Sequence, residues 1–324
     1  MHFPLYFFTL TVAVIQAAAA PSKLFSPDNL IKPLLVGDHP IVSDVEIANF
    51  ALTLEHLENA FYTTGLQNFS AQVFADAGFA PAVRGFYEQL ALHEKTHVDN
   101  LTSILGDKAV KPCVYDFGDN LDVKTFVDIS DMLEVVGASA YNGAARFINN
   151  KDIIALAVSI LATEARQSTW INNAVRKANP WSTSYETSLD LNQAFTLASS
   201  LIVSCPSDNP PLPVTVFPSL SVVPSIAQPG QNITLNITSA YSQDQSLNGT
   251  GLFATFLSGI TPTSLSLDGQ SAPFNVTIPP ELRGFVYLVI SNSSSVADDT
   301  TTVAGPAFFN LAFDSNDTII TLQV

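Results

Sequence analysis

Four segments in the N-terminal half of the chain carry apolar residues at helical spacing, and a carboxylate interrupts each apolar stripe near its middle. The stripes advance in steps of three and four residues, the spacing that keeps side chains on one face of an α-helix. We expect helices over residues 43–66, 82–105, 123–148 and 152–178, and a fifth over 184–203. Long helices with short joints predict a four- to five-helix bundle in residues 42–205.

The predicted inner faces contain few polar residues besides these carboxylates. Their members in chain order are Ala51, Glu55, Glu58 and Tyr62; Leu90, Glu94, His97, Leu101 and Ile104; Val127, Ser130, Glu134, Gly137, Tyr141, Ala145 and Ile148; and Ile153, Ala157, Ile160, Glu164, Gln167, Ile171 and Ala174. An unpaired carboxylate is costly to bury. A pair of divalent metal ions would remove that cost, because such cations favour carboxylate and imidazole ligands. The expected ligands are Glu55, Glu94, His97, Glu134 and Glu164.

An internal repeat supports this interpretation. Glu55 and Tyr62 are seven residues apart, and so are Glu134 and Tyr141. In the helix that follows each pair, a Glu precedes a His or a Gln by three residues. The order Glu…Tyr and then Glu-x-x-His/Gln therefore occurs twice, as a duplicated helical hairpin would produce.

Three motifs carry a resemblance to a known family: LEHLENAFY at residues 54–62, HEKTH at 93–97 and TEARQSTW at 163–170. They resemble the ferritin-like superfamily, and more narrowly the secreted ferritin-like proteins that include fungal stress-response and plant desiccation-related proteins. The resemblance covers residues 42–203. It implies a ferritin-like bundle that holds a pair of iron or manganese ions. It leaves open whether the chain is an enzyme, and the class it implies is a metal-dependent oxidoreductase.

One position departs from the family pattern. The resemblance would place His at position 167, where this chain has Gln167. An amide oxygen is a weaker ligand for iron than an imidazole nitrogen. Three readings of the second ion's position stay open: the site holds a single ion, it holds manganese or another hard ion, or it has lost its metal. The alternative function is a non-catalytic secreted or cell-wall protein with a degenerate metal site.

Other residues near the stripes have two readings. Glu58 shares the face of Glu55 and is an alternative ligand or a partner of the ligands, although it breaks the repeat. Tyr62 and Tyr141 are expected as core aromatic residues, and the resemblance adds hydrogen bonds from them to the carboxylates. Residues expected to have no role in metal binding are His56 and His93, at the surface, and Trp170 and Trp181, in packing contacts.

Residues 206–324 follow a different pattern, rich in Pro, Ser, Thr, Asn and Gly. Short β-branched or aromatic runs occur at residues 233–237, 253–257, 274–278, 285–290 and 318–324. These runs and the turn residues between them predict a small, immunoglobulin-like β-sandwich, joined to the bundle by a linker at residues 206–211. This half contains no His and no Cys, and nothing in it resembles a catalytic site.

The N-terminus predicts secretion. Residues 1–20 contain no Lys, Arg, Asp or Glu, and an apolar run from residue 7 ends in four alanines. Small residues after a short apolar stretch are typical of a signal peptide rather than a membrane anchor. Cys113 and Cys205 are expected to pair in an oxidising compartment. No second apolar run of membrane length follows, so we expect no transmembrane anchor.

Eight Asn-x-Ser/Thr sequons predict glycosylation. They begin at Asn68, Asn100, Asn232, Asn236, Asn248, Asn275, Asn292 and Asn316. The formal net charge of −16 argues against nucleic acid as a partner, because its phosphates attract Lys and Arg. Cell-wall glycans or proteins are the partners that a glycosylated β half suggests. That appended half also argues against a ferritin-type cage, because it would obstruct close packing of the bundles.

Overall fold

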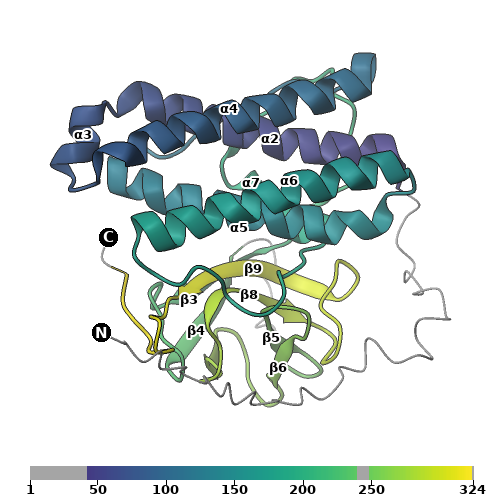
Figure 1. Ribbon diagram of the computed structural model, residues 1–324. Helices are drawn as coiled ribbons and strands as arrows, with labels where there is room; N and C mark the ends of the chain where they lie inside the picture. Colours follow the sequence, from purple (N-terminus) through teal and green to yellow (C-terminus); the bar gives the residue numbers. More distant parts are fainter. Residues whose placement is uncertain (1–41, 239–247, 323–324) are drawn as a thin grey trace, which may run out of the picture. The chain divides into compact units, whose positions relative to one another are not determined.

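The computed structural model describes residues 42–238 and 248–322 (Figure 1). The described residues belong to one compact unit. The expected signal peptide lies outside the described residues and stays a prediction. In the described part of the chain, no helix is long and apolar enough to cross a membrane.

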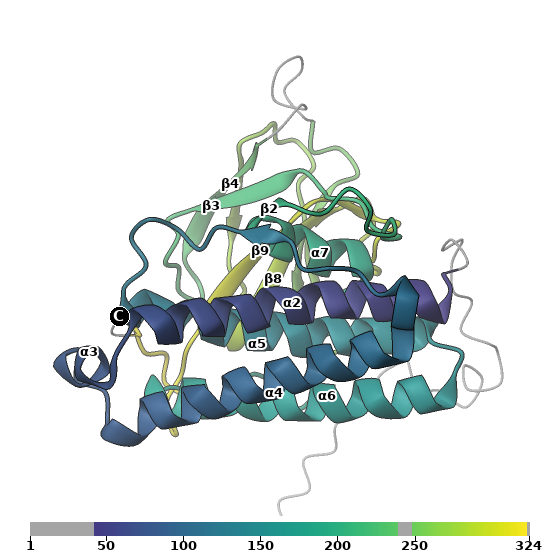
Figure 2. The same ribbon diagram turned by 90° about the horizontal axis from the view of Figure 1, so that it is seen from above.

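Four long helices form the bundle: α2 (Asp44–Asn68), α4 (Pro81–Leu105), α5 (Val123–Ala144) and α6 (Lys151–Thr169). In Figure 2, α2 packs beside α4 and α5 packs beside α6. A short helix, α3 (Ala71–Asp76), connects α2 to α4, and a 3-10 turn (Ala145–Phe147) follows α5. The helical bundle predicted for the N-terminal half is confirmed, although α3 was not expected.

Local chemistry explains where two of these helices begin and end. The hydroxyl group of Ser43 accepts a hydrogen bond from the Glu46 backbone N–H, and the Glu46 carboxylate accepts one from the Ser43 backbone. This reciprocal pair satisfies two backbone donors at the start of α2. Pro81 opens α4, where its missing N–H costs nothing. Gly106 ends α4 with φ of +57°, a conformation that glycine adopts without strain.

The fourth predicted helix does not continue as an α-helix to residue 178. After Thr169 the backbone becomes a π-helix over Trp170–Val175. The wider turn changes which side chains face inward, so Ala174 is exposed and Val175 is buried, contrary to the predicted stripe. A similar error affects the end of α4, where Ile104 is exposed and Leu105 is buried.

The fifth predicted helix is much shorter than expected. It forms α7 over Leu191–Ser199, because Asp190 and Gln193 make a capping box that starts the helix there. Residues 202–204 are not helical but form strand β2 (Ile202–Ser204), which pairs with β1 (Val114–Tyr115). The disulfide between Cys113 and Cys205 joins the two segments next to this ladder, as the sequence predicted.

Among its described residues, the C-terminal half contains two antiparallel sheets, as predicted. One has the order β3–β4–β7, with β3 at Ser219–Val223, β4 at Asn232–Thr238 and β7 at Phe274–Thr277. The other has the order β6–β5–β8–β9, with β6 at Thr263–Ser266, β5 at Phe253–Leu257, β8 at Gly284–Ser291 and β9 at Thr302–Leu311. Leu235 and Phe274 from the first sheet share an apolar core with Phe256 and Leu288 from the second.

The prediction of a strand at residues 318–324 is wrong for residues 318–322, the described part of that range. Residues 318–322 form only an isolated bridge, between Ile319 and Phe313. The carboxylate of Asp314 accepts hydrogen bonds from the backbone N–H groups of Asn316 and Thr318, and this turn replaces a ladder. Strands β3, β6 and β9 were not expected.

Strand β8 contacts both the sandwich core and the bundle. All eight of its residues are buried. Val286, Leu288 and Ile290 face the core between the sheets, whereas Tyr287 packs with the helices. The Tyr287 hydroxyl group lies 2.9 Å from Ser139 Oγ and donates to the Val135 carbonyl oxygen, and both of those residues belong to α5. The four-stranded sheet therefore covers one face of the bundle (Figure 1).

The sequon asparagines lie on the surface, with one partial exception. Seven of them are exposed and Asn236 is half-buried. Their exposure is compatible with modification, and glycosylation itself stays a prediction.

Candidate metal centre

The mid-helix carboxylates of the four long helices meet inside the bundle. Glu55 on α2, Glu94 on α4 and Glu164 on α6 are fully buried, and Glu134 on α5 is 1% exposed. His97, one turn after Glu94, is 9% exposed. The helical spacing read from the sequence therefore places all five predicted ligands in the interior.

Four of these residues form a compact cluster. One ligand atom from each of Glu55, Glu94, His97 and Glu164 lies within 4.8 Å of the others. Nδ1 of His97 lies 3.2 Å from Oε2 of Glu55 and 3.0 Å from Oε2 of Glu94. Three carboxylates and one imidazole at this spacing are a donor set that iron, manganese or zinc accepts.

Glu134 is buried nearby but lies outside this group of four. Oε1 of Glu134 accepts a hydrogen bond from the Tyr62 hydroxyl group. Oε1 of Glu55 accepts one from the Tyr141 hydroxyl group at 2.5 Å. Tyr62 and Tyr141, which were expected in the core, therefore also donate hydrogen bonds to carboxylates of the site.

Several buried oxygen atoms around the cluster have no hydrogen-bond partner. They are Oε2 of Glu134, both carboxylate oxygens of Glu164 and the amide oxygen of Gln167. A buried acceptor without a partner costs about 1–3 kcal/mol, and more when it is charged. A cation bound among these oxygens would remove that cost, so the residues present fit a metal ion.

Gln167 occupies the position where the resemblance noted above would place His. Nε2 of Gln167 lies 2.9 Å from Oε1 of Glu94 and 3.3 Å from Nδ1 of His93. The amide group therefore donates on one side, and its oxygen is the atom left without a partner. His93 has an exposed side chain, as expected, but it also contacts Gln167, which the sequence did not reveal.

Gly137 on α5 provides space for two of the carboxylates. A Cβ atom at this position would lie 2.6 Å from Oε2 of Glu164 and 2.9 Å from Oε1 of Glu58. Both distances are too short for a non-bonded contact, so a larger side chain here would force these carboxylates to shift. The same measurement places the Glu58 carboxylate beside that of Glu164, and Glu58 is 4% exposed. The sequence contains a signal for this close approach, because Gly137 lies in the same apolar stripe as Glu134.

Four side chains in and beside the cluster, Glu55, Glu58, His97 and Glu164, hold their protons more tightly than isolated side chains do. Burial raises the pKa of Glu55 to about 7. Burial, followed by repulsion from neighbouring carboxylates, raises the pKa values of Glu58 and Glu164 well above the usual range. Burial opposes a charge on His97, but its contacts with Glu55 and Glu94 outweigh that effect and raise its pKa to about 10. A divalent cation would replace these protons.

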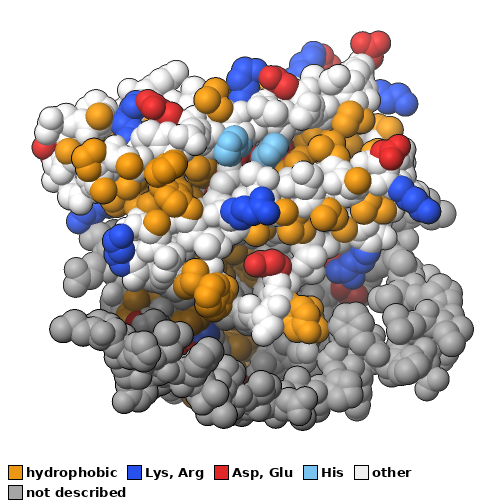
Figure 3. Space-filling view, in the orientation of Figure 1, with side chains coloured by type: hydrophobic (Ala, Val, Ile, Leu, Met, Phe, Trp, Pro, Cys, Tyr) orange, Lys and Arg blue, Asp and Glu red, His pale blue; other side chains and the backbone are white. Residues whose placement is uncertain are grey.

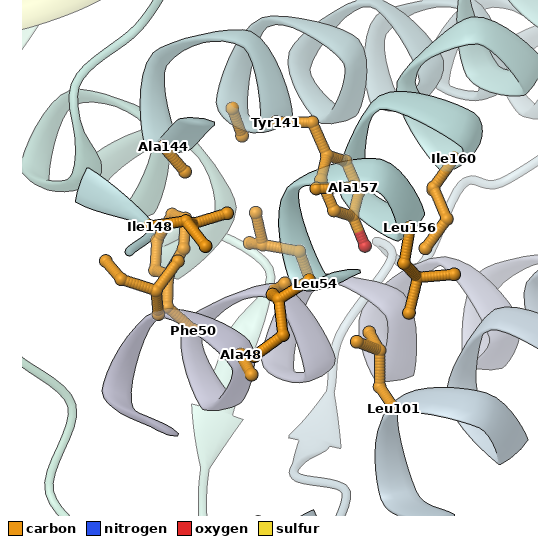
Figure 4. A pocket seen from close by; sticks show the side chains of 14 residues that line it. Ala48, Phe50, Leu54, Leu101, Tyr141, Ala144, Ile148, Leu156, Ala157 and Ile160 are labelled. Atoms are coloured by element: carbon orange, nitrogen blue, oxygen red, sulfur yellow. The ribbon is translucent and has the colours of Figure 1, made fainter. Parts of the chain in front are cut away.

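The two sides of the cluster differ in their surroundings. On one side, Tyr141, Leu54 and Leu101 border an apolar pocket shown in Figure 4, together with Ala157 and Ile160. On another side, histidine side chains reach the surface in the seam between α4 and α6, as Figure 3 shows. His97 of the cluster is itself 9% exposed.

Comparison with known proteins agrees with the helical fold of this domain. Residues 43–177 match the family model for the ferritin-like domain, and the chain contains such a domain. The chain is also similar to Protein rds1 of Schizosaccharomyces pombe, with 30% identity over 236 residues. The aligned region covers 72% of this chain and 56% of that protein, so the chain spans about half the length of this curated relative.

Proposed function

We propose that the ferritin-like domain binds iron or manganese at the buried Glu/His cluster. The observation that carries this proposal is the group of four ligand atoms within 4.8 Å, surrounded by buried oxygens that lack partners. The first ion would be held by Glu55, Glu94, His97 and Glu164, and a second by donors among Glu58, Glu134, Glu164 and Gln167.

A bound iron or manganese ion would supply one-electron redox chemistry at this position, and a metal-dependent oxidoreductase is the enzyme class it would support. The chain's own side chains hold the donors in place. Tyr141 and Tyr62 each donate to one oxygen of a carboxylate, which fixes its orientation. The pocket beside Tyr141 is lined almost entirely by apolar side chains, so it offers the bound ion no competing ligands on that side.

Metal analysis of the purified protein tests the proposal. We expect at least one equivalent of iron or manganese per chain after gentle purification, and reloading of the metal-free protein by either ion. The double variant E94A/H97A should lose the metal. The control is Glu88→Ala, which removes an exposed carboxylate from the same helix and should retain the metal. Less than about a tenth of an equivalent in the wild-type protein, before and after reloading, would overturn the proposal.

The second candidate function is a non-catalytic protein with a degenerate metal site. The specific observation in its favour is Gln167, which satisfies one oxygen of Glu94 without any ion. Thermal unfolding separates the two candidates. A metal centre predicts that Mn²⁺ raises the melting temperature of the wild-type protein but not that of E94A/H97A. A degenerate site predicts no response in either protein.

We further propose that the chain is a secreted glycoprotein with a role in stress response. The disulfide between Cys113 and Cys205 and the exposed sequon asparagines support secretion. The stress role rests on the family resemblance alone. Amino-terminal sequencing of protein from the culture medium, with enzymatic removal of N-glycans, tests location and glycosylation. Retention inside cells with an intact residue 1–20 segment would contradict secretion.

A further inference from the structure

The loop between the π-helix and α7 displays two large aromatic side chains to solvent. Trp181 is 65% exposed and Tyr185 is 58% exposed. Within the described ranges, Phe86 is the other aromatic residue with comparable exposure, and it lies on α4. The expectation that Trp181 is a packing residue is therefore wrong. Exposure of two large apolar rings on one loop is unfavourable in the free protein, because their surface stays in contact with water. Exposed apolar surface of this kind often marks a binding site.

Both rings border one crevice, and the rest of its lining is mainly polar. Ser168 and Asn172 contribute from the helical side, and Glu186 and Thr187 from the loop. Strand β8 closes the crevice with Phe285 and Tyr287. Among the described residues that line it, none is Lys or Arg. The lining therefore combines aromatic faces with hydroxyl, amide and carboxyl groups and offers no cation for an anionic ligand.

Hydrogen bonds hold the loop in this conformation. The Thr169 hydroxyl group donates to the Pro180 carbonyl oxygen at 3.0 Å, and the Asn179 amide donates to the Trp181 carbonyl oxygen at 2.9 Å. On the sandwich side, the Phe285 backbone N–H donates to the Ser182 hydroxyl oxygen at 2.8 Å.

Further along the loop, the Asn142 amide on α5 donates to the Glu186 carbonyl oxygen at 3.1 Å, and the Gly259 backbone N–H donates to the Thr187 hydroxyl oxygen at 2.8 Å. The loop is thus tied to the bundle and to the sandwich at successive residues. Rings displayed on such a framework lose little entropy when they bind a ligand.

We propose that this crevice binds a neutral saccharide, with Trp181 and Tyr185 stacking against sugar rings. A pyranose ring has a face of weakly polarised C–H bonds, which suits the negative face of an aromatic ring. Its hydroxyl groups lie around the edge, where they would meet the hydroxyl, amide and carboxyl groups of the crevice. A membrane or an apolar helix would instead need a continuous apolar patch. The residues between Trp181 and Tyr185 in the sequence are Ser182, Thr183 and Ser184, which are all polar.

Two sources offer this chemistry: wall polysaccharides and the N-glycans of glycoproteins. Laminarihexaose and chitohexaose represent the first, and a high-mannose N-glycan represents the second. The chain contains two tryptophans, and Trp170 packs against Phe86 and Tyr87. In a Trp170→Phe variant, Trp181 is the sole fluorescent tryptophan and reports on the crevice directly.

We expect a saturable change in Trp181 emission with at least one of the three saccharides. Calorimetry with the otherwise unmodified protein gives the affinity independently of that variant. Trp181→Ala and Tyr185→Ala should each weaken binding by about tenfold or more, as truncated aromatic anchors do. Phe86→Ala removes a matched exposed ring and should leave the affinity unchanged. Circular dichroism confirms that each variant is folded.

Three outcomes would overturn the proposal: no saturable signal from fluorescence or calorimetry with any of the saccharides, an equal loss of affinity in Phe86→Ala, or saccharide binding that survives the Trp181→Ala, Tyr185→Ala double variant. Neutral lipid vesicles serve as the competing ligand, and binding to them in preference to sugar would also contradict it. The experiment involves no metal, so its result is independent of the cluster.

Discussion

The hydroxyl group of Tyr141 on α5 donates a 2.5 Å hydrogen bond to Oε1 of Glu55 on α2. The equivalent pair of the internal repeat makes the same contact in the opposite direction: Tyr62 on α2 donates a hydrogen bond to Oε1 of Glu134 on α5. Each tyrosine therefore holds the carboxylate of the other copy of the repeat. In both carboxylates, the tyrosine occupies Oε1. Oε2 of Glu55 meets His97, and Oε2 of Glu134 has no hydrogen-bond partner.

Replacing Tyr141 by Phe removes the hydroxyl group that orients Glu55. We expect the affinity for Mn²⁺ to fall by about tenfold or more, with the fold retained, because outer hydrogen bonds of this kind have effects of that size. Competition against a chromophoric chelator measures the affinity. Tyr185→Phe, which changes an exposed ring, is the control. Equal affinities in wild-type protein and Tyr141→Phe would show that the hydroxyl group does not orient the ligand.

Replacing Gln167 by His supplies the imidazole that the family resemblance would place at this position. The imidazole is a stronger ligand than the amide oxygen, so we expect bound iron to rise toward about two equivalents per chain. Elemental analysis after anaerobic reconstitution measures this ratio. Gln167→Leu offers no donor and should bind no more than the wild-type protein. A Gln167→His variant with unchanged stoichiometry would argue that residue 167 does not determine the second ion's position.

The metal-free protein should become less stable as the pH rises from about 5 to 10. The folded protein raises the pKa of Glu55 from 4.5 to about 7, so protonated Glu55 favours folding below pH 4.5 and this benefit disappears by pH 7. The pKa of His97 rises from 6.5 to about 10, so the benefit of its charged form disappears between those values.

Melting temperatures across this pH range, measured with and without Mn²⁺, check the expectation. Bound metal should flatten or reverse the trend, because binding requires the deprotonated ligands. Asp131 and Asp299, whose pKa values burial also raises to about 7, contribute in the same direction as Glu55. Glu55→Gln should therefore reduce the slope below pH 7 without abolishing it. A metal-free protein that gains stability from pH 5 to 7 would contradict the argument.

Replacing Gly137 by Ala places a methyl group against the carboxylates of Glu164 and Glu58. We expect loss of metal binding, because the two side chains must move apart. Gly85→Ala on α4 is the matched control, since an added Cβ there meets nothing within 4 Å. That control should retain metal and gain about 0.5–1 kcal/mol of stability from its better helix propensity. Chemical denaturation and metal analysis of both variants provide the comparison, and normal metal content in Gly137→Ala would contradict the steric argument.

Local sequence chemistry predicted much of the bundle. Ser43, Pro81 and Gly106 mark helix ends through interactions with nearby backbone, so their effect is visible in the sequence. The π-helix after Thr169 was not predictable in this way, because a one-residue change of turn leaves the apolar pattern almost intact. The ladder between β1 and β2 pairs segments that are far apart in the sequence, next to a disulfide whose cysteines are 92 residues apart. Its strands are too short to show a pattern in the sequence.

The candidate site was predictable as a set of inward-facing residues but not as a geometry. Helical spacing was enough to place Glu94 and His97 together. The offset of Glu134 from the group of four, and the contact between His93 and Gln167, depend on side-chain rotamers and on how far apart the helices lie. Spacing along one helix contains no information about either.

Strand β8 has no side that faces solvent, because alternate side chains pack into the sandwich core and against α5. The two halves of the sequence look like separable modules, yet neither can melt without uncovering part of the other. Heating should therefore produce a single cooperative transition. Differences in stability measured for variants of the cluster will then report on the whole described fold, and a substitution at Tyr287 will change the thermal stability of helices that it does not belong to.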